Sequence, residues 1–158
     1  MSNFNPFKTH NMKLNSVTLT IKVDKDDILQ LIYAASSWHC VSDKSARRVT
    51  ADNERLCLMK MKEGYDDLHS RVMGYTVFAN FNPNLDRANV AFTFKFHCEP
   101  SVTMPEELKQ IVTQYLANFV LMRLYGEHVS YYSIACRKYR AQMLLVFARD
   151  ANREPLRA

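Results

Sequence analysis

Three segments of the chain alternate between apolar and polar residues, the pattern typical of strands with one buried face. In residues 17–23, valine, leucine and isoleucine alternate with threonine and lysine. Residues 75–81 alternate in the same way, although Phe78 makes the opposite face apolar too. Residues 90–98 have the clearest pattern, with phenylalanine at every second position from 92 to 96. We therefore predict three strands.

Four further segments place apolar residues at spacings of three and four, which is typical of helices with one buried face. The pattern predicts helices over residues 25–39 and about 130–148, and a long helix between them that begins after Thr103 and ends at Gly126. The remaining helix has its N-cap at Thr50 or Asp52. Its apolar stripe consists of Leu58, Met61, Tyr65, Leu68 and Val72.

Residues with known preferences for helix ends lie at the predicted boundaries. Asp24 precedes the first helix, where its carboxylate can accept hydrogen bonds from backbone N–H groups. Thr103 and Glu106 have the spacing of a capping box. Gly74 and Gly126 follow the second and third helices, so we expect each to end its helix, with Gly74 as a left-handed residue.

The order of these elements determines the expected fold class. The order β-α-α-β-β-α-α contains no regular βαβ repeat, which argues against a doubly wound sheet. We expect an α+β fold of four helices packed around a small antiparallel sheet. A single domain over residues 14–148 would follow an extended N-terminal arm, residues 1–13, and precede a basic C-terminal tail, residues 149–158.

Composition narrows the possible functions. The 158 residues are 47% hydrophobic and 23% charged, as in an ordinary globular domain. Only three glycines are present, and they are widely separated. Phosphate-binding loops of the P-loop, Rossmann and kinase types need clustered glycines, so these classes are excluded. Gly64 lies inside the second predicted helix, where the pattern shows no need for a glycine.

The four cysteines and the apolar segments indicate where the protein is made. The cysteines are separated by 17, 41 and 38 positions, and no pair has a zinc-ligand spacing. No apolar run is long enough for a signal peptide or a membrane span. We expect a soluble protein from a reducing cytoplasm, without metal, cofactor or membrane contact, whose cysteines are buried.

Basic residues are concentrated at the two ends of the chain. Residues 1–23 carry three basic residues and no acid, and residues 129–158 carry six basic and two acidic residues. Residues 24–128 carry 12 basic and 14 acidic residues. Basic ends on a nearly neutral body suit attachment to an acidic partner surface or a phosphate backbone, although solvated ends are an equally simple reading.

One cluster has residue types suited to metal binding or catalysis. Glu63, Asp66, Asp67 and His69 lie within two turns of the second predicted helix, and carboxylates are ligands for hard divalent cations. The apolar stripe of this helix must face the core, however, which turns much of the cluster toward solvent. We therefore expect a charged surface and no metal site.

Two adjacent pairs, His39-Cys40 and His97-Cys98, combine a base with a nucleophile. Adjacent residues in a strand point to opposite faces, so His97 cannot activate Cys98. No known hydrolase or metalloprotease motif is present. We expect no enzymatic activity, no catalytic residues and no small-molecule substrate.

A small nucleic-acid-binding or regulatory protein is the alternative function that the basic residues suggest. Arg47 and Arg48 lie in a polar segment, and Arg137, Lys138 and Arg140 lie on the last predicted helix, where they could contact phosphates. No recognised nucleic-acid-binding motif accompanies them. The alternating phenylalanines of residues 92–96 could stack on bases, but such a face is more often core.

The layout as a whole resembles that of a family of small virion proteins. An N-terminal strand leads into an acid-capped helix (VTLTIKVDKDDILQLIYAASSW), and a basic loop enters the next helix through T-x-D-N-E. Two strands, a P-E-E-L helix and a helix rich in tyrosine and arginine follow. Over roughly residues 14–148, this order is similar to that of neck, head–tail connector and tail-completion proteins of tailed phages and prophages of gut bacteria.

The resemblance implies a structural role in the virion, after synthesis in the host cytoplasm. It implies a ring-forming subunit that binds further copies and other virion proteins through its ends, and it implies no catalytic residues. Contact with DNA phosphates is a further expectation. The expected interface residues are aromatic or basic: Phe4, Phe7, Arg47, Arg48, Arg137, Lys138, Arg140, Arg149, Arg153 and Arg157.

Overall fold

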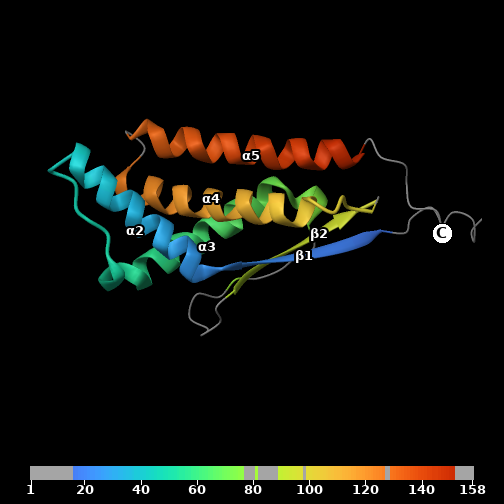
Figure 1. Ribbon diagram of the computed structural model, residues 1–158, viewed down its shortest axis with the longest axis horizontal. Coiled ribbons are helices and arrows are strands. Elements are labelled where there is room, and N and C mark those ends of the chain that lie inside the picture. Colours follow the sequence, from blue (N-terminus) through green and yellow to red (C-terminus); the bar gives the residue numbers. More distant parts are fainter. Residues whose placement is uncertain (1–15, 77–80, 82–88, 98, 127–128, 152–158) are drawn as a thin grey trace, which may run out of the picture.

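Four long helices lie beside a two-stranded antiparallel sheet (Figure 1). The computed structural model describes residues 16–76, 81, 89–97, 99–126 and 129–151. The elements are β1 (Val17–Asp24), α2 (Lys25–Ser42), α3 (Glu54–Arg71), β2 (Asn89–Phe96), α4 (Met104–Tyr125) and α5 (Ser130–Ala151). The predicted α+β class with four helices is confirmed.

The sheet pairs the first strand of the chain with the strand whose sequence alternates most regularly. β1 and β2 are antiparallel in a register that joins Val17 to Phe96 and Asp24 to Asn89. The alternating phenylalanines of β2 are buried, so their side of the sheet is core and offers no surface for stacking bases. On the other face, the hydroxyls of Thr20 and Thr93 are 2.9 Å apart.

The strand predicted over residues 75–81 is only partly described, and its first residue is not in a strand. Tyr75 ends a short 3-10 turn, Met73–Tyr75, because its N–H donates to the Val72 carbonyl, 2.8 Å away. Thr76 forms an isolated antiparallel bridge with Phe94 of β2. Residues 77–80 lie outside the described residues.

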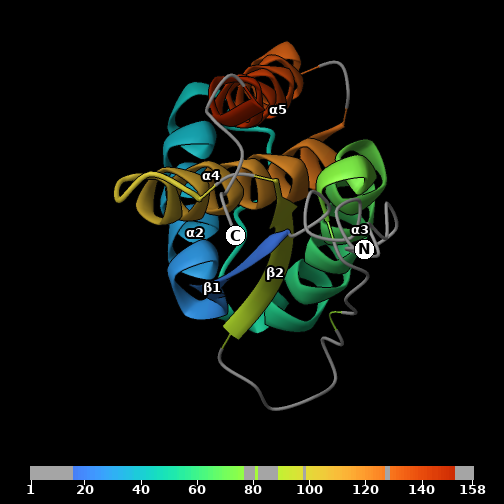
Figure 2. The same cartoon turned by 90° about the vertical axis from the view of Figure 1, so that its right-hand side faces the viewer.

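α4 is the centre of the helical layer. It packs against α2, α3, α5 and β1, and Figure 2 shows it crossing above the strands with α2 and α3 on opposite sides. Because it is covered on several sides, much of its surface is core. Its buried residues are Met104, Leu108, Ile111, Val112, Tyr115, Leu116, Ala117, Phe119, Val120 and Leu121.

The three glycines have three different structural roles. Gly126 ends α4 with φ 90°, and its N–H donates to the Met122 carbonyl over 2.9 Å, so this prediction is confirmed. Gly74 does not have the predicted left-handed conformation and lies within the 3-10 turn after α3. Gly64 is buried, and a Cβ there would lie 2.8 Å from Cδ1 of Phe119, so α3 and α4 can approach closely only without that side chain.

The helix caps follow the sequence signals in part. Asp24 caps α2 as predicted, since its carboxylate accepts from the Asp26 N–H over 2.8 Å. Thr103 does not form the predicted capping box with Glu106. Its hydroxyl instead donates to Oε1 of Glu107, 3.0 Å away, because Thr103 itself has helical dihedral angles. The end of α5 also differs from the prediction. The helix continues past residue 148 to Ala151, so the first three residues of the predicted tail, 149–151, are helical.

The segment between α2 and α3 is tied to the helices by one buried serine. The hydroxyl of Ser36 accepts the Val49 N–H over 2.6 Å and lies 2.6 Å from the Tyr125 hydroxyl. Tyr125 in turn donates to the Arg47 carbonyl over 2.9 Å. This polar segment therefore has a defined backbone path, while the side chains of Arg47 and Arg48 are exposed.

Candidate functional site

The carboxylates of Glu63, Asp66 and Asp67, the cluster weighed above as a possible metal site, are engaged by basic side chains. Glu63 lies 3.1 Å from Nζ of Lys60, and Asp66 lies 3.1 Å from Nζ of Lys62. Asp67 lies 3.0 Å from Nε of Arg71. Across the part of the chain that the structure describes, no three histidine, cysteine or acidic side chains are grouped so as to hold a metal ion.

The remaining member of that cluster and the His39-Cys40 pair are occupied by other contacts. The ring of His69 stacks on Tyr65 with centroids 6.3 Å apart. The ring of His39 stacks on Tyr125 at 4.1 Å, and the Cys40 thiol donates to the Ala46 carbonyl over 3.4 Å. The Cys40 thiol is therefore not hydrogen-bonded to the His39 ring, as a nucleophile would be to its general base.

Two other thiols are buried in the core. Burial raises the pKa of Cys57 to about 11, and burial likewise raises the pKa of Cys136 to about 11. Because the thiolate is the nucleophilic form, both cysteines are unreactive near neutral pH. Cys98, the other cysteine singled out beside a histidine, lies outside the described residues.

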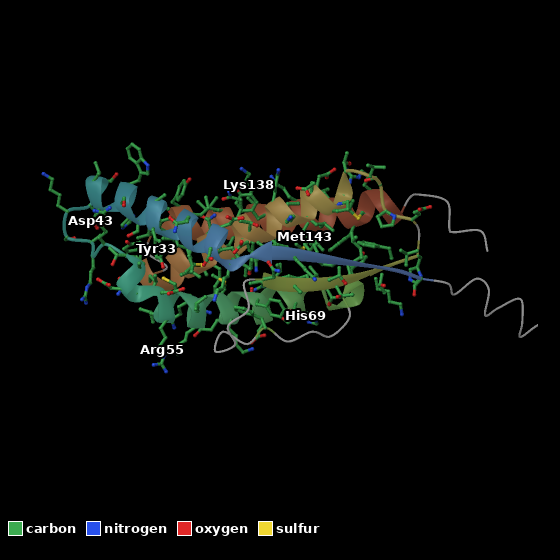
Figure 3. The ribbon with its side chains drawn as sticks, turned by 60° about the horizontal axis from the view of Figure 1, so that its bottom comes forward. Tyr33, Asp43, Arg55, His69, Lys138 and Met143 are labelled. Carbon is green, nitrogen blue, oxygen red and sulfur yellow. The ribbon has the colours of Figure 1, made fainter. Side chains whose placement is uncertain are left out.

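The structure separates the predicted basic interface residues. Arg149 lies on α5 and pairs with Glu107 over 3.2 Å. Lys138 also lies on α5, with Nζ 5.4 Å from the ring centroid of Tyr139, and Figure 3 shows it at the edge of the molecule opposite Arg55. Of the remaining predicted interface residues, four fall outside the described residues: Phe4, Phe7, Arg153 and Arg157.

Arg137 and Arg140 are brought together with two arginines that the sequence analysis did not single out. Arg71 of α3, Arg123 of α4 and the two arginines of α5 line one pocket of about 230 Å³. Ser133 precedes Arg137 by one helical turn and lines the same pocket. We call this site the arginine pocket. It could not be read from the sequence, because its four cations are spread over nearly 70 positions and three helices.

A buried tyrosine and a carboxylate form one wall of the arginine pocket. Tyr115 is 1% exposed and donates its hydroxyl to Oδ2 of Asp67, 2.5 Å away. Burial and this hydrogen bond both raise the pKa of Tyr115 above its usual value, so the hydroxyl remains a donor. Since Asp67 also accepts from Arg71, the carboxylate is held in place by two elements.

Arg123 is held by a second pair of contacts beside the arginine pocket. Its Nε lies 3.7 Å from Oε2 of Glu63, and its guanidinium carbon lies 5.1 Å from the ring centroid of Phe119. Within the described residues, Arg137 and Arg140 have no such carboxylate partner. Four arginines and one carboxylate, Asp67, line the pocket, and Glu63 pairs with Arg123 beside it, which leaves an excess of positive charge.

A long groove runs along the opposite flank of α4. α2 and α5 both pack on α4 but meet each other chiefly at one end, where the rings of His39 and Tyr132 are 5.8 Å apart. Two adjoining cavities of about 780 and 310 Å³ fill the space between them, and both are lined by Gln114 and Tyr139. We call this feature the α2–α5 groove.

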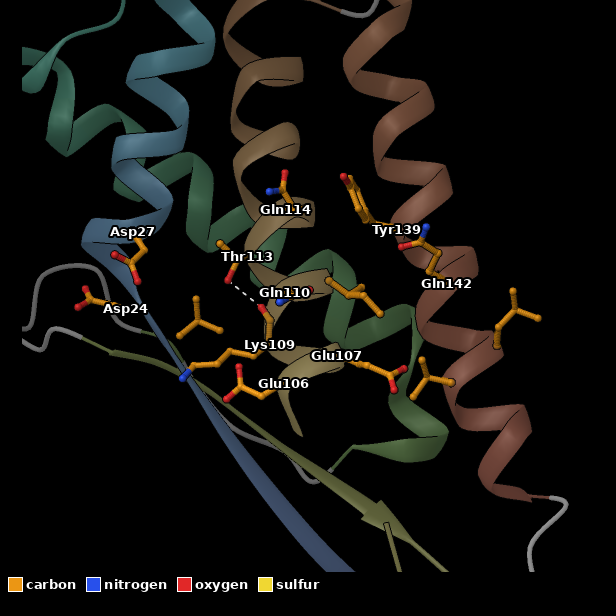
Figure 4. A pocket seen from close by; sticks show the side chains of 14 residues that line it. Asp24, Asp27, Glu106, Glu107, Lys109, Gln110, Thr113, Gln114, Tyr139 and Gln142 are labelled. Carbon is orange, nitrogen blue, oxygen red and sulfur yellow. Dashed lines mark hydrogen bonds between the residues drawn. The ribbon is translucent and has the colours of Figure 1, made fainter. Parts of the chain in front are cut away.

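One end of the groove is acidic. Figure 4 shows Asp24 and Asp27 at the start of α2, with Glu106 and Glu107 on the first turn of α4. Glu107 is paired with Arg149, whereas Lys109 is the cation that lines this end from α4. The acidic end therefore attracts positively charged groups.

The other end of the groove is apolar, and its rim is unusually exposed. Leu31 and Ala35 on α2 face Tyr131 and Ile134 on α5 across Ala117 of α4. Tyr131 is 71% exposed and Ile134 is 54% exposed. Large exposed apolar residues gathered in one concave place are uncommon on a protein surface, which makes this end of the groove a candidate binding surface.

The groove and the arginine pocket lie on opposite flanks of the α4–α5 pair. On α4, Gln110, Gln114 and Ala117 line the groove, whereas Tyr115 and Phe119 line the pocket. At 100° per residue these two sets are on opposite faces of the helix. One flank thus offers an acidic and apolar groove, and the other offers a basic pocket.

No protein-family model, no curated protein and no solved structure matches this chain. Within the residues that the structure describes, none of the helices is both long and apolar enough to cross a lipid bilayer.

Proposed function

We propose that the chain is a non-enzymatic assembly protein whose copies join head-to-tail into a ring. The observation that carries this proposal is the α2–α5 groove, which combines an exposed apolar rim with an acidic end. The N-terminal arm, residues 1–13, has the matching chemistry, since it contains Phe4, Phe7, Lys8 and Lys13 and no acidic residue. In this proposal the arm of one copy binds in the groove of the next.

The dimensions of the groove fit an extended arm. From Glu106 to Leu121, its α4 floor is roughly 22 Å long at 1.5 Å per residue. About seven residues of extended chain cover that length at ~3.3 Å each. Phenylalanine side chains would fill the apolar end, and lysines would lie among the carboxylates of the acidic end.

The direction of β1 favours an arm from a neighbouring copy. β1 runs from Val17 toward Val23 and Asp24, which line the groove, so the chain enters the strand at the end remote from the groove. An arm that bound its own groove would have to turn back along roughly 23 Å of strand before it reached the acidic end. A neighbouring copy supplies the arm without this reversal, and repeated head-to-tail contacts of this kind close into a ring.

Photo-crosslinking between isotopically distinct copies tests this arrangement. Full-length chain with Phe7→benzoylphenylalanine is mixed as heavy and light forms, irradiated and digested. We expect mixed-isotope crosslinks to peptides of α2 and α5 that line the groove, and none from a control probe at Tyr75, which stacks on Phe147 instead. Crosslinks only within one copy, or a monomer by native mass spectrometry, would contradict the proposal.

Neutralising the acidic end tests the charge contribution separately. In D27N/E106Q, the lysines of the arm lose their partners, so we expect a larger fraction of monomer by native mass spectrometry. D52N/E54Q is the matched control, because it removes one aspartate and one glutamate from exposed first-turn positions outside the groove. An equal increase in the monomer fraction in both variants would show that the groove carboxylates contribute no more to assembly than other surface carboxylates.

The further assignment to a tailed-phage virion, at the neck, head–tail connector or tail-completion region, is supported by the resemblance in layout. A ring subunit with an arm that binds its neighbour suits such a position. We expect the gene to lie beside capsid or tail genes and the protein to be present in purified particles by mass spectrometry. A gene far from any virion gene would argue strongly against this assignment.

The arginine pocket favours a second candidate function, nucleic-acid binding. Four guanidinium groups in one place can contact a phosphate backbone, and Arg47 and Arg48 provide a separate exposed pair. Binding of this kind weakens steeply as salt rises. The test is a salt titration of duplex DNA binding, and duplex affinity that does not depend on salt would contradict this candidate.

A further inference from the structure

We infer that the arginine pocket is a specific binding site for a phosphate group. This inference does not depend on ring formation, because the pocket and the α2–α5 groove lie on opposite flanks of the α4–α5 pair. Arg71, Arg123, Arg137 and Arg140 would supply guanidinium donors, and Ser133 would supply a hydroxyl.

The charge of the pocket suits an anion of more than one negative charge. Two of its arginines are partly neutralised, Arg71 by Asp67 and Arg123 by Glu63. Arg137 and Arg140 have no carboxylate partner among the described residues. A phosphate monoester carries a charge of about −1.5 to −2 at pH 7, which balances the charge of two guanidinium groups.

The arrangement of the donors favours phosphate over a carboxylate. The guanidinium groups come from α3, α4 and α5, so they approach the pocket from three directions. A tetrahedral phosphate has oxygens that point in as many directions, whereas a carboxylate offers two oxygens in one plane. Arginine is suited to phosphate because its planar fork of N–H donors forms bidentate hydrogen bonds.

The walls of the pocket hold this arrangement in place. Asp67 accepts hydrogen bonds from Arg71 and from the buried hydroxyl of Tyr115. The carboxylate therefore holds one arginine in position, and its negative charge is partly balanced by that arginine. The ring of Phe119 lies under Arg123 and limits the positions of that guanidinium group. The pocket volume of about 230 Å³ is several times the volume of about 30 Å³ that one water molecule takes in the liquid. The pocket therefore has room for a phosphate group.

The decisive experiment titrates the full chain with inorganic phosphate by calorimetry at constant ionic strength, with chloride as the competing anion. We expect saturable binding to one site per chain. R137Q/R140Q should weaken the affinity for phosphate at least tenfold. R47Q/R48Q is the matched control, because it removes the same charge from exposed arginines outside this pocket, and its affinity should be unchanged.

The outcomes distinguish a site from a general charge effect. Absence of saturable phosphate binding, or equal weakening in the two double variants, overturns the inference. Thermal unfolding of each variant without phosphate identifies loss of folding, and S133A provides a test that leaves the charge unchanged. A several-fold loss of phosphate affinity in S133A supports the site, whereas unchanged affinity in both S133A and R137Q/R140Q overturns it.

A second titration identifies the source of the phosphate group. If the group belongs to a nucleic-acid backbone, a 12-base-pair duplex competes with inorganic phosphate, and R137Q/R140Q lowers the salt slope of duplex binding by about 2. If the ligand is a free phosphate or a phosphomonoester, the duplex does not compete. If the duplex binds through Arg47 and Arg48 alone and inorganic phosphate does not bind, the phosphate site in the arginine pocket is wrong. Nucleic-acid binding would then still be supported.

Discussion

At the scale of single residues, Gly64 shows how one missing side chain allows two helices to pack. A Cβ at this position would lie 2.8 and 2.9 Å from two ring carbons of Phe119 and 3.3 Å from Cδ2 of Leu116. All three contacts are with side chains that are themselves buried on α4. A Cβ therefore fits only if the Phe119 ring or the Leu116 side chain shifts.

We predict that Gly64→Ala lowers the free energy of unfolding by up to about 2 kcal/mol, because overpacking a core costs about 1–3 kcal/mol. The higher helix propensity of alanine offsets about 1 kcal/mol of that cost. Gly74→Ala is the control, because a Cβ there meets nothing within 4 Å. Urea unfolding of both variants measures the difference, and a G64A variant as stable as G74A would contradict the close packing of α3 on α4.

The cysteines differ in their access to reagents. Cys57 and Cys136 are 0% and 4% exposed, whereas Cys40 is only half-buried near the end of α2. With iodoacetamide at pH 8, we expect alkylation of Cys40 well before Cys57 and Cys136, as measured by peptide mass mapping over time. In urea the three rates should become similar. Early alkylation of Cys57 or Cys136 in the folded chain would contradict their burial.

At the scale of elements, the segment between α2 and α3 depends on Ser36 for its attachment to the helices. Ser36 is the one polar residue among those described that is fully buried, and its hydroxyl joins the Val49 N–H to Tyr125 of α4. A single side chain thus links α2, the connecting segment and α4. Because Ser36 and Val49 are buried, the Val49 N–H depends on the Ser36 hydroxyl for its hydrogen bond.

We predict that Ser36→Ala lowers the free energy of unfolding by about 1–3 kcal/mol, since the Val49 N–H loses its acceptor. Hydrogen exchange of the amides in residues 43–50 should also become faster. Ser37→Ala is the control, because Ser37 donates only to the Tyr33 carbonyl of its own helix. Unchanged exchange in S36A would mean that other contacts hold the segment.

At the scale of the whole molecule, α4 divides the surface into two sides of different charge. It packs against all three other helices and β1, so each flank of the α4–α5 pair is built from several elements. The proposed ring uses the groove on one flank, and the inferred phosphate site uses the pocket on the other. Both can therefore be occupied at the same time.

Buried thiols couple the stability of the whole fold to alkaline pH. The pKa of Cys57 and of Cys136 is about 11 in the folded chain, against 9.0 for an unperturbed thiol. A raised pKa gives stability that is complete below about pH 9 and is lost as the pH rises toward 11. Tyr33, Tyr65 and Tyr132, with pKa values raised from 10.0 to about 12, add a smaller loss that begins just below pH 10 and grows above it.

We therefore predict that the free energy of unfolding falls between pH 9 and 10, by up to about 1 kcal/mol for each thiol. Urea unfolding at pH 8, 9 and 10 measures this loss. In C57V/C136V, which keeps apolar side chains of similar size in the core, the loss over this interval should be smaller, and the tyrosines should account for what remains. An identical decline in this double variant would exclude the thiols as its cause.

The pattern of residues along the chain was sufficient to predict four helices, two strands, the Asp24 cap and the end of α4 at Gly126. These features depend on interactions within a few residues, so periodicity and cap residues report them directly. The prediction was wrong for the conformation of Gly74, for the capping box at Thr103 and for Tyr75 as a strand residue. In each case a local hydrogen bond or turn replaced the expected one, and propensity alone does not decide between such close alternatives.

The tertiary structure alone decided the need for Gly64, the arginine pocket and the α2–α5 groove. Helical periodicity shows which face of a helix is buried, but it does not show which other helix covers that face. Arg71 and Arg123 join Arg137 and Arg140 only because α3, α4 and α5 pack side by side. The sequence by itself determined the elements and their buried faces, and long-range packing determined which charged side chains those elements bring together.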